Sequence, residues 1–153
     1  MAQLFTLEPE AVATARAVDR HAAIERLAER FAEVHGLERG EVLDRLEERE
    51  RLGSTGFGRG VAVPHARIDG LRAPVAAFLR LEAPVDFNAA DGMPVNLVFG
   101  LLSPSQSGAA HLQALAAISR MMRDERMRSS LDSAPDREAL YGLLCNVIDR
   151  DAA

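Results

Sequence analysis

A glycine-rich segment constrains this chain more than any other feature of its sequence. Four glycines fall within the eight residues from Gly53 to Gly60, so the backbone there can adopt turns that other residues avoid. Before this segment, residues 41–52 carry apolar side chains at helical spacing, and the first glycine ends that helix. After it, residues 61–63 predict a short strand, because Pro64 biases the preceding residue towards an extended conformation. The chain is therefore predicted to pass from a helix through a sharp loop to a strand that runs into Pro64 and His65.

The remaining pattern predicts a single α/β domain, a mixed β-sheet flanked by helices. A length of 153 residues fits one domain. Strands that alternate with helices of this kind are typical of a sheet covered by helices. The predicted elements, in chain order, are a strand at 11–18, helices from Asp19 to Gly36 and at 41–52, strands at 61–63, 75–81 and 95–102, a long helix at 109–129 with Leu112 on its inward face, and a last helix after Pro135 with Ser133 or Ala134 near its cap.

The chain is acidic and contains no lysine. Its net charge is -5 and its pI about 5.4, and all 18 basic residues are arginine. The acidic balance argues against a nucleic-acid or membrane-surface partner. The missing lysine excludes mechanisms that need a Schiff-base lysine or a P-loop lysine. Any positive charge at a functional site must therefore come from arginine or histidine.

Cysteine content and hydropathy indicate a soluble, cytoplasmic protein. Cys145 is the single cysteine, so no internal disulfide forms, and its apolar helical surroundings predict a buried packing role. No 18-residue apolar run and no signal-peptide pattern occurs, which predicts no direct membrane insertion.

The glycine-rich segment has the chemistry of an anion site. Residues 49–67 contain four arginines and one glutamate, a local charge of +3 within a chain of -5. Glycine backbone N–H groups and the hydroxyls of Ser54 and Thr55 are donors of the kind that hold an oxyanion. Neither a Walker loop nor a dinucleotide fingerprint fits the residues. The alternative is a glycine-rich structural turn without a ligand.

His65 stands next to this loop, after a strand and a proline. A neutral imidazole nitrogen is a competent nucleophile towards a phosphoryl group, provided that an acceptor fixes the proton on the other ring nitrogen. Arg49 is the arginine best suited to hold the phosphoryl oxygens in bidentate fashion. The alternative is a structural or merely exposed loop histidine.

His111 is the second candidate. It lies in the first turn of the predicted long helix, where free N–H groups and the helix dipole favour an anion. It is predicted to donate to a phosphoryl group on His65; the alternative is a role in capping or packing the helix end. The histidine spacing and the single cysteine predict no metal site, and no Gly-x-Ser-x-Gly elbow of a serine hydrolase occurs.

Two segments together resemble the signature of the type-2 enzyme IIA domains of the bacterial phosphotransferase system. This family includes the fructose- and mannitol-specific domains and the nitrogen-regulatory enzyme IIA. The first segment is Arg49-Glu50-x-x-Gly53-Ser54-Thr55-Gly56-x-Gly58-x-Gly60-x-Ala62-x-Pro64-His65, and the second is Leu101-Leu102-Ser103-Pro104 followed by His111-Leu112-x-x-Leu115. The order of elements is similar over residues 4–148.

The resemblance implies a mixed sheet flanked by helices and a set of roles. His65 would be phosphorylated by an upstream histidine phosphocarrier, without a cofactor. Arg49 would stabilise the phosphoryl group, and His111 would be the second active-site histidine. The phosphoryl group would then pass to a IIB domain or remain as a regulatory mark. Two residues depart from the family pattern: Ala66 stands where glycine is usual, and Arg67 where lysine is common.

The leading hypothesis is thus a regulatory phosphoryl carrier of the nitrogen-regulatory branch, acting on partner proteins, rather than an enzyme that turns over a small substrate. The predicted phosphoryl-binding residues are Gly53, Ser54, Thr55 and Gly56, with Arg59 and Arg67 at the rim. The first alternative is a fructose- or mannitol-type transport subunit that passes phosphate to a IIB domain. A second is a binding module that is never phosphorylated, and a third is a metal-dependent hydrolase.

Overall fold

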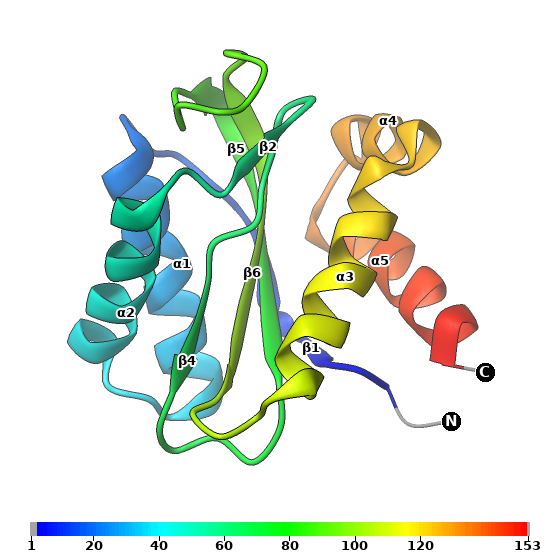
Figure 1. The fold of residues 1–153 in the computed structure, drawn as a ribbon. Helices are drawn as coiled ribbons and strands as arrows, with labels where there is room; N and C mark the ends of the chain where they lie inside the picture. Colours follow the sequence, from blue (N-terminus) through cyan, green and yellow to red (C-terminus); the bar gives the residue numbers. More distant parts are fainter. Residues whose placement is uncertain (1–2, 153) are drawn as a thin grey trace.

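The structure, a computed structural model, describes residues 3–152 as eleven helices and strands. In chain order they are β1 (Thr6–Ala15), α1 (Arg20–His35), α2 (Arg39–Leu52), β2 (Gly56–Gly58), β3 (Val61–Ala62), β4 (His65–Ile68), β5 (Val75–Val85), β6 (Val95–Pro104), α3 (Ala109–Arg123), α4 (Glu125–Ser133) and α5 (Arg137–Ala152). Figure 1 shows three layers: α1 and α2 cover one face of the sheet, and α3, α4 and α5 lie on the other. The predicted class, a single α/β domain with a mixed sheet flanked by helices, is confirmed.

The sheet has six strands, and β6 organises it. The strand order is β1-β5-β6-β3-β2, and β4 also pairs with β6. β5 runs antiparallel to β6, whereas β3 and β4 both run parallel to it. Pro64 lies between β3 and β4, and its carbonyl oxygen accepts the N–H of Leu101 at 3.0 Å. His65, in register with Leu101, is therefore held on the backbone of the central strand.

The core lies on both faces of the two long strands. Most of β5 and all of β6 except its second and last residues are buried, as expected for strands covered on both sides. Gly100 is where α1 approaches the sheet, because a Cβ atom there would lie 2.6 Å from Cδ2 of Leu27. Close packing of α1 on β6 therefore requires glycine at this position.

The boundaries of α1 are those predicted from its capping residues. The Asp19 carboxylate accepts the N–H of Ala22 at 2.8 Å, which satisfies a free donor of the first turn. Gly36 ends the helix with a φ of 65°, in the left-handed region that favours glycine.

The strand predictions were incomplete. β1 covers Thr6–Ala15 rather than residues 11–18, because pairing with β5 already begins at Thr6. A register shift between Leu7 and Val12 accommodates the irregular stretch around Pro9. β2 and β4 were not predicted. β2 has only three residues, two of them glycine, and pairs with the neighbouring β3, whereas β4 pairs with the distant β6. Neither strand carries a local hydrophobic alternation that would mark it.

The helix predictions need three corrections. The expected helix 109–129 is broken at Asp124, whose carboxylate accepts the N–H groups of Arg126 and Met127 and so caps a separate α4. Asp136, rather than Ser133 or Ala134, caps α5, because its carboxylate accepts the N–H of Ala139. Leu112 is 63% exposed instead of inward-facing. The fourth difference concerns Cys145, which is half-buried rather than buried, with Sγ 3.5 Å from a carboxylate oxygen of Asp149.

Candidate functional site

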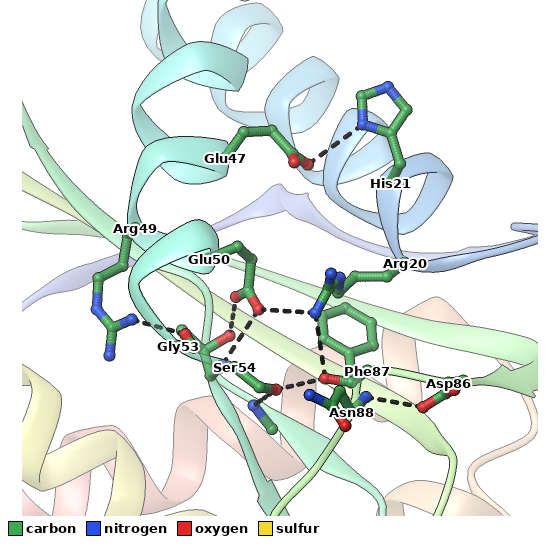
Figure 2. A network of polar contacts seen from close by, with 12 residues as sticks. Arg20, His21, Glu47, Arg49, Glu50, Gly53, Ser54, Asp86, Phe87 and Asn88 are labelled. Atoms are coloured by element: carbon green, nitrogen blue, oxygen red, sulfur yellow. Dashed lines mark hydrogen bonds and ion pairs between the residues drawn. The ribbon is translucent and has the colours of Figure 1, made fainter.

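The last turn of α2 carries two neighbouring charged residues whose side chains point in opposite directions. Figure 2 shows the Glu50 side chain turned towards Arg20, and the Arg49 side chain on the other side of the helix. Arg49 NH1 donates to the carbonyl oxygen of Gly53 at 2.8 Å. The glycine that ends the helix therefore also provides an acceptor that holds the arginine.

Glu50 is a buried carboxylate, 4% exposed, that ties the loop after α2 to the rest of the domain. One carboxylate oxygen accepts the Thr55 hydroxyl, and the other accepts the Thr55 N–H at 3.2 Å. Arg20 NH1 lies 3.9 Å from Glu50 Oε2 and donates to the carbonyl oxygen of Phe87 at 3.5 Å. We call Arg20, Glu50, Ser54, Thr55 and Phe87 the Glu50 network.

The residues of the predicted anion-binding loop take part in this network. Ser54 Oγ donates to the Phe87 carbonyl and accepts the N–H of Gly56 at 3.0 Å, and Thr55 is directed to Glu50. The N–H of Gly53 donates to the carbonyl oxygen of Glu50 at 3.1 Å. The donors expected to hold a phosphoryl group are thus engaged with protein acceptors, so Gly53, Ser54, Thr55 and Gly56 shape the loop.

His65 has one ring nitrogen committed to the backbone and one facing a cation. Its Nδ1 lies 2.7 Å from the carbonyl oxygen of Val63. A carbonyl oxygen can only accept, so Nδ1 carries the proton and Nε2 bears the lone pair. Arg49 Nε donates to that Nε2 at 3.2 Å. The ring nitrogen with the lone pair therefore lies against the guanidinium of Arg49.

His111 lies beside His65, from the first turn of α3. The two rings have centroids 5.6 Å apart and are tilted by 48°. His111 is 3% exposed, and its Nδ1 lies 2.7 Å from Oγ of Ser103 at the end of β6. The structure therefore brings together the three residues predicted to be catalytic: Arg49, His65 and His111.

Both histidines are held in the neutral form. Burial is the largest cause that lowers the pKa of His65, and Arg49 and Arg67 lower it further, against the opposing effect of the Val63 carbonyl. The pKa of His111 falls from 6.5 to about 4, chiefly because of burial and then because of Arg67 and His65. At neutral pH both rings carry an unprotonated nitrogen.

These histidines line a pocket of about 620 Å³ with a basic rim. Arg67, expected at the rim of the phosphoryl site, is one of its lining residues. Sequence reasoning missed Arg45, although it precedes Arg49 by four residues and so shares its helix face. It also missed the Val63 carbonyl, for which no sequence signal exists. The lining residues are Arg45, Glu48, Arg49, Arg51, Leu52, His65, Ala66, Arg67, His111, Leu112 and Leu115.

Arg59 does not belong to this pocket, which corrects its predicted place at the rim. It lies at the turn between β2 and β3 and lines a different cavity, with Arg123 and Arg128. The hairpin of β2 and β3 carries this turn away from β4, so closeness in the sequence does not bring Arg59 to His65.

No group of three or more His, Cys, Asp and Glu side chains within residues 3–150 is arranged to hold a metal ion. None of the helices described is both long enough and apolar enough to cross a bilayer.

The fold and the site define an α/β domain in which two neutral histidines and an arginine share a basic pocket. The family model described as "Phosphoenolpyruvate-dependent sugar phosphotransferase system, EIIA 2" matches residues 6–147. The chain belongs to this family, the type-2 enzyme IIA domains that the two sequence segments resemble.

Similar proteins carry regulatory as well as transport names. A nitrogen regulatory protein of Bradyrhizobium diazoefficiens is 42% identical over 137 residues, which are 89% of this chain and 90% of that protein. A fructose-specific EIIA component of Haloferax volcanii is 38% identical over 112 residues, 73% of each chain. Among solved structures, the nitrogen regulatory protein IIA-Ntr of Neisseria meningitidis has a TM-score of 0.83 and 32% identity, and the match covers 90% of this chain and 95% of that one.

Proposed function

We propose that His65 accepts a phosphoryl group on Nε2 and that the phosphorylated domain, residues 4–148, regulates partner proteins. One observation carries the proposal: the bond from Nδ1 of His65 to the Val63 carbonyl leaves Nε2 unprotonated beside Arg49. A nucleophile needs this lone pair, and the lowered pKa of His65 keeps it available at neutral pH.

The reaction exchanges one P–N bond for another. The Nε2 lone pair of His65 attacks the phosphorus of a phosphohistidine on an upstream histidine phosphocarrier. The P–N bond of the carrier breaks, and its electron pair returns to the imidazole of the carrier. The new bond makes the His65 ring cationic while Nδ1 keeps its proton, and the hydrogen bond to the Val63 carbonyl stabilises that charge.

Arg49 has two roles in this proposal. In the resting protein its Nε donates to the nucleophile, and its NH1 is held by Gly53. On transfer the guanidinium turns from the ring nitrogen to the phosphoryl oxygens, where it offsets their charge.

His111 and Arg67 complete the phosphoryl environment. If the Ser103 hydroxyl donates to Nδ1 of His111, the ring proton resides on Nε2 and is free to donate to the phosphoryl group. Arg67 adds a further positive charge to the pocket.

The regulatory branch is favoured by the nitrogen regulatory relative, which matches about nine-tenths of both chains. A regulator of this kind acts by docking in the cytoplasm, and its pocket presents a basic face before phosphorylation and a dianionic group afterwards. Its partners in this proposal are the upstream phosphocarrier and one or more regulatory targets.

A transport role is the second candidate, and the fructose-specific relative favours it. In that case His65 would pass the phosphoryl group to a IIB domain. Transfer of label from the phosphorylated protein to a fructose-type IIB domain, at a rate comparable to its loading, would support transport over regulation.

The test is incubation with a phosphorylated histidine phosphocarrier. We expect one acid-labile phosphate per chain in the wild type and none in His65→Ala. His21→Ala is the matched control, because His21 is an exposed histidine bound to Glu47 at 3.3 Å, and it should label normally. Label retained in His65→Ala would refute the assignment, and a folded wild type that never labels would favour a binding module.

A further inference from the structure

A second basic pocket lies between the β2–β3 turn and the junction of α3 with α4. It has a volume of about 420 Å³ and is lined by Phe57, Gly58, Arg59, Arg123, Glu125 and Arg128. It shares no lining residue with the His65 pocket. Its volume is within the range of pockets that bind small molecules.

Arg128 is a buried cation that lines this pocket. It is 8% exposed, and its NH1 donates to the carbonyl oxygen of Met122 at 2.9 Å. No carboxylate of residues 3–150 lies within ion-pair distance of it. A buried guanidinium without a counter-charge is costly, and an anion in the pocket would offset that cost.

Arg123 lies over an aromatic ring at the wall of the pocket. Its guanidinium carbon lies 6.0 Å from the ring centroid of Phe57, a cation–π arrangement. The side chain is exposed, but this contact restricts it to the pocket wall. A pre-placed arginine loses less side-chain entropy when it binds an anion.

Arg59 occupies a backbone conformation that favours glycine or asparagine. Its φ is 58°, and its N–H donates to Oδ2 of Asp91 at 2.8 Å. The Asp91 carboxylate thus fixes the turn that carries Arg59 to the pocket. Arg59 does not line the His65 pocket and has no role in the proposed phosphoryl transfer.

The charges of the pocket favour an anion. Three arginines and one glutamate line it, a net charge of +2, and Asp91 adds one negative charge behind the Arg59 backbone. Arginine forks match phosphate oxygens in bidentate geometry. We propose that this pocket binds a small phosphate-bearing anion with two or more negative charges, at a site separate from His65.

The test is a titration of the full chain with inorganic pyrophosphate, in which backbone amide chemical shifts report binding. Chloride keeps the ionic strength constant. We expect saturable shifts at residues 57–60 and 123–128. Arg123→Gln and Arg59→Asn should each weaken binding about tenfold, because each removes a charge-assisted contact. Asparagine tolerates the left-handed backbone of position 59, so that variant keeps the turn.

Arg120→Gln is the matched control, since Arg120 is exposed on α3 but does not line the pocket. Arg49→Gln separates the two pockets, because it should alter shifts around His65 and leave those around Arg59 unchanged. Tighter binding of a sugar bisphosphate than of pyrophosphate would identify an organic ligand. The proposal would be overturned by shifts that never saturate, by shifts confined to the His65 pocket, or by an equal loss of affinity in Arg120→Gln. Binding of a polyglutamate peptide without any response to pyrophosphate would also overturn it.

Discussion

Arg49 and Glu50 are adjacent in the sequence, yet they belong to two different regions of the molecule (Figure 2). Glu50 is buried, and its oxygens are occupied by Thr55 and face Arg20. Arg49 is half-buried, lines an open pocket and donates to a nitrogen that is proposed to react. One side of the helix turn is closed by internal hydrogen bonds, and the other is available to a partner.

Glu50 holds the loop in place, whereas Arg49 contacts the residue proposed to react. The Glu50 network fixes residues 53–56, and Gly53 of that loop in turn provides the acceptor for Arg49. Polar groups that are already paired inside the protein stabilise structure and have little capacity left for a ligand. Glu50 is therefore expected to contribute to stability, and Arg49 to phosphoryl transfer.

The largest effect is expected for Glu50→Ala. It leaves Arg20 and both donors of Thr55 without their carboxylate, so the free energy of unfolding should fall by about 3 kcal/mol. Denaturant unfolding measures this. Glu47→Ala is the control on the same helix, and it should cost no more than about 0.5 kcal/mol because its partner His21 is exposed. Equal losses in the two variants would show that Glu50 contributes no more to stability than an exposed carboxylate on the same helix.

Arg49→Gln should change transfer rather than stability. Loss of a preorganised charged donor should slow phosphorylation by a histidine phosphocarrier about a hundredfold. The free energy of unfolding should stay within about 0.5 kcal/mol of the wild type, because the side chain is only half-buried. Rapid-quench labelling and denaturant unfolding measure the two quantities. Normal labelling with a large loss of stability would mean that Arg49 supports the fold and not phosphoryl transfer.

Acid should lower the free energy of unfolding by protonating His111 in the His65 pocket. Between pH about 4 and 6.5, the folded protein binds fewer protons at His111 than the unfolded chain does, because the pKa falls from 6.5 to about 4 on folding. Stability is therefore lost as the pH decreases through this window. His111→Gln should lose about 2 kcal/mol less than the wild type between pH 7 and 4.5. The same pH dependence in both proteins would exclude His111 as the cause.

The smallest effect is expected for Thr55→Val. It removes the hydroxyl that donates to Glu50 but keeps the backbone N–H and the side-chain shape. The expected loss is about 1 kcal/mol in the free energy of unfolding. Transfer to His65 should be unchanged in the same labelling assay. Slower labelling would mean that Thr55 contacts the phosphoryl group after all.

The sequence predicted which two histidines lie side by side, because local features mark both of them. His65 follows Pro64, and His111 opens a helix after a polar loop, and both features are readable in the chain. It did not predict that the hydroxyls of Ser54 and Thr55 donate to acceptors within the protein. A sequence does not distinguish a hydroxyl that binds a ligand from one that binds a buried carboxylate, and the burial of Glu50 is seen only in the structure.

Arg59 was misplaced for a related reason. Its distance from His65 depends on the hairpin of β2 and β3, and neither strand has a hydrophobic pattern of its own. Elements whose boundaries are set by their own residues were predicted closely, as α1 was from its capping residues. β4 was missed because its partner β6 lies far along the chain, and β2 because three residues with two glycines carry no strand pattern.

The proposed function depends most directly on Nε2 of His65 as the atom that carries the phosphoryl group. Proton–nitrogen correlation spectra of the phosphorylated protein distinguish the two ring nitrogens directly. We predict phosphorus coupling at Nε2 and a proton retained on Nδ1, held by the Val63 carbonyl. Phosphorus on Nδ1, or on any residue other than His65, would contradict the account.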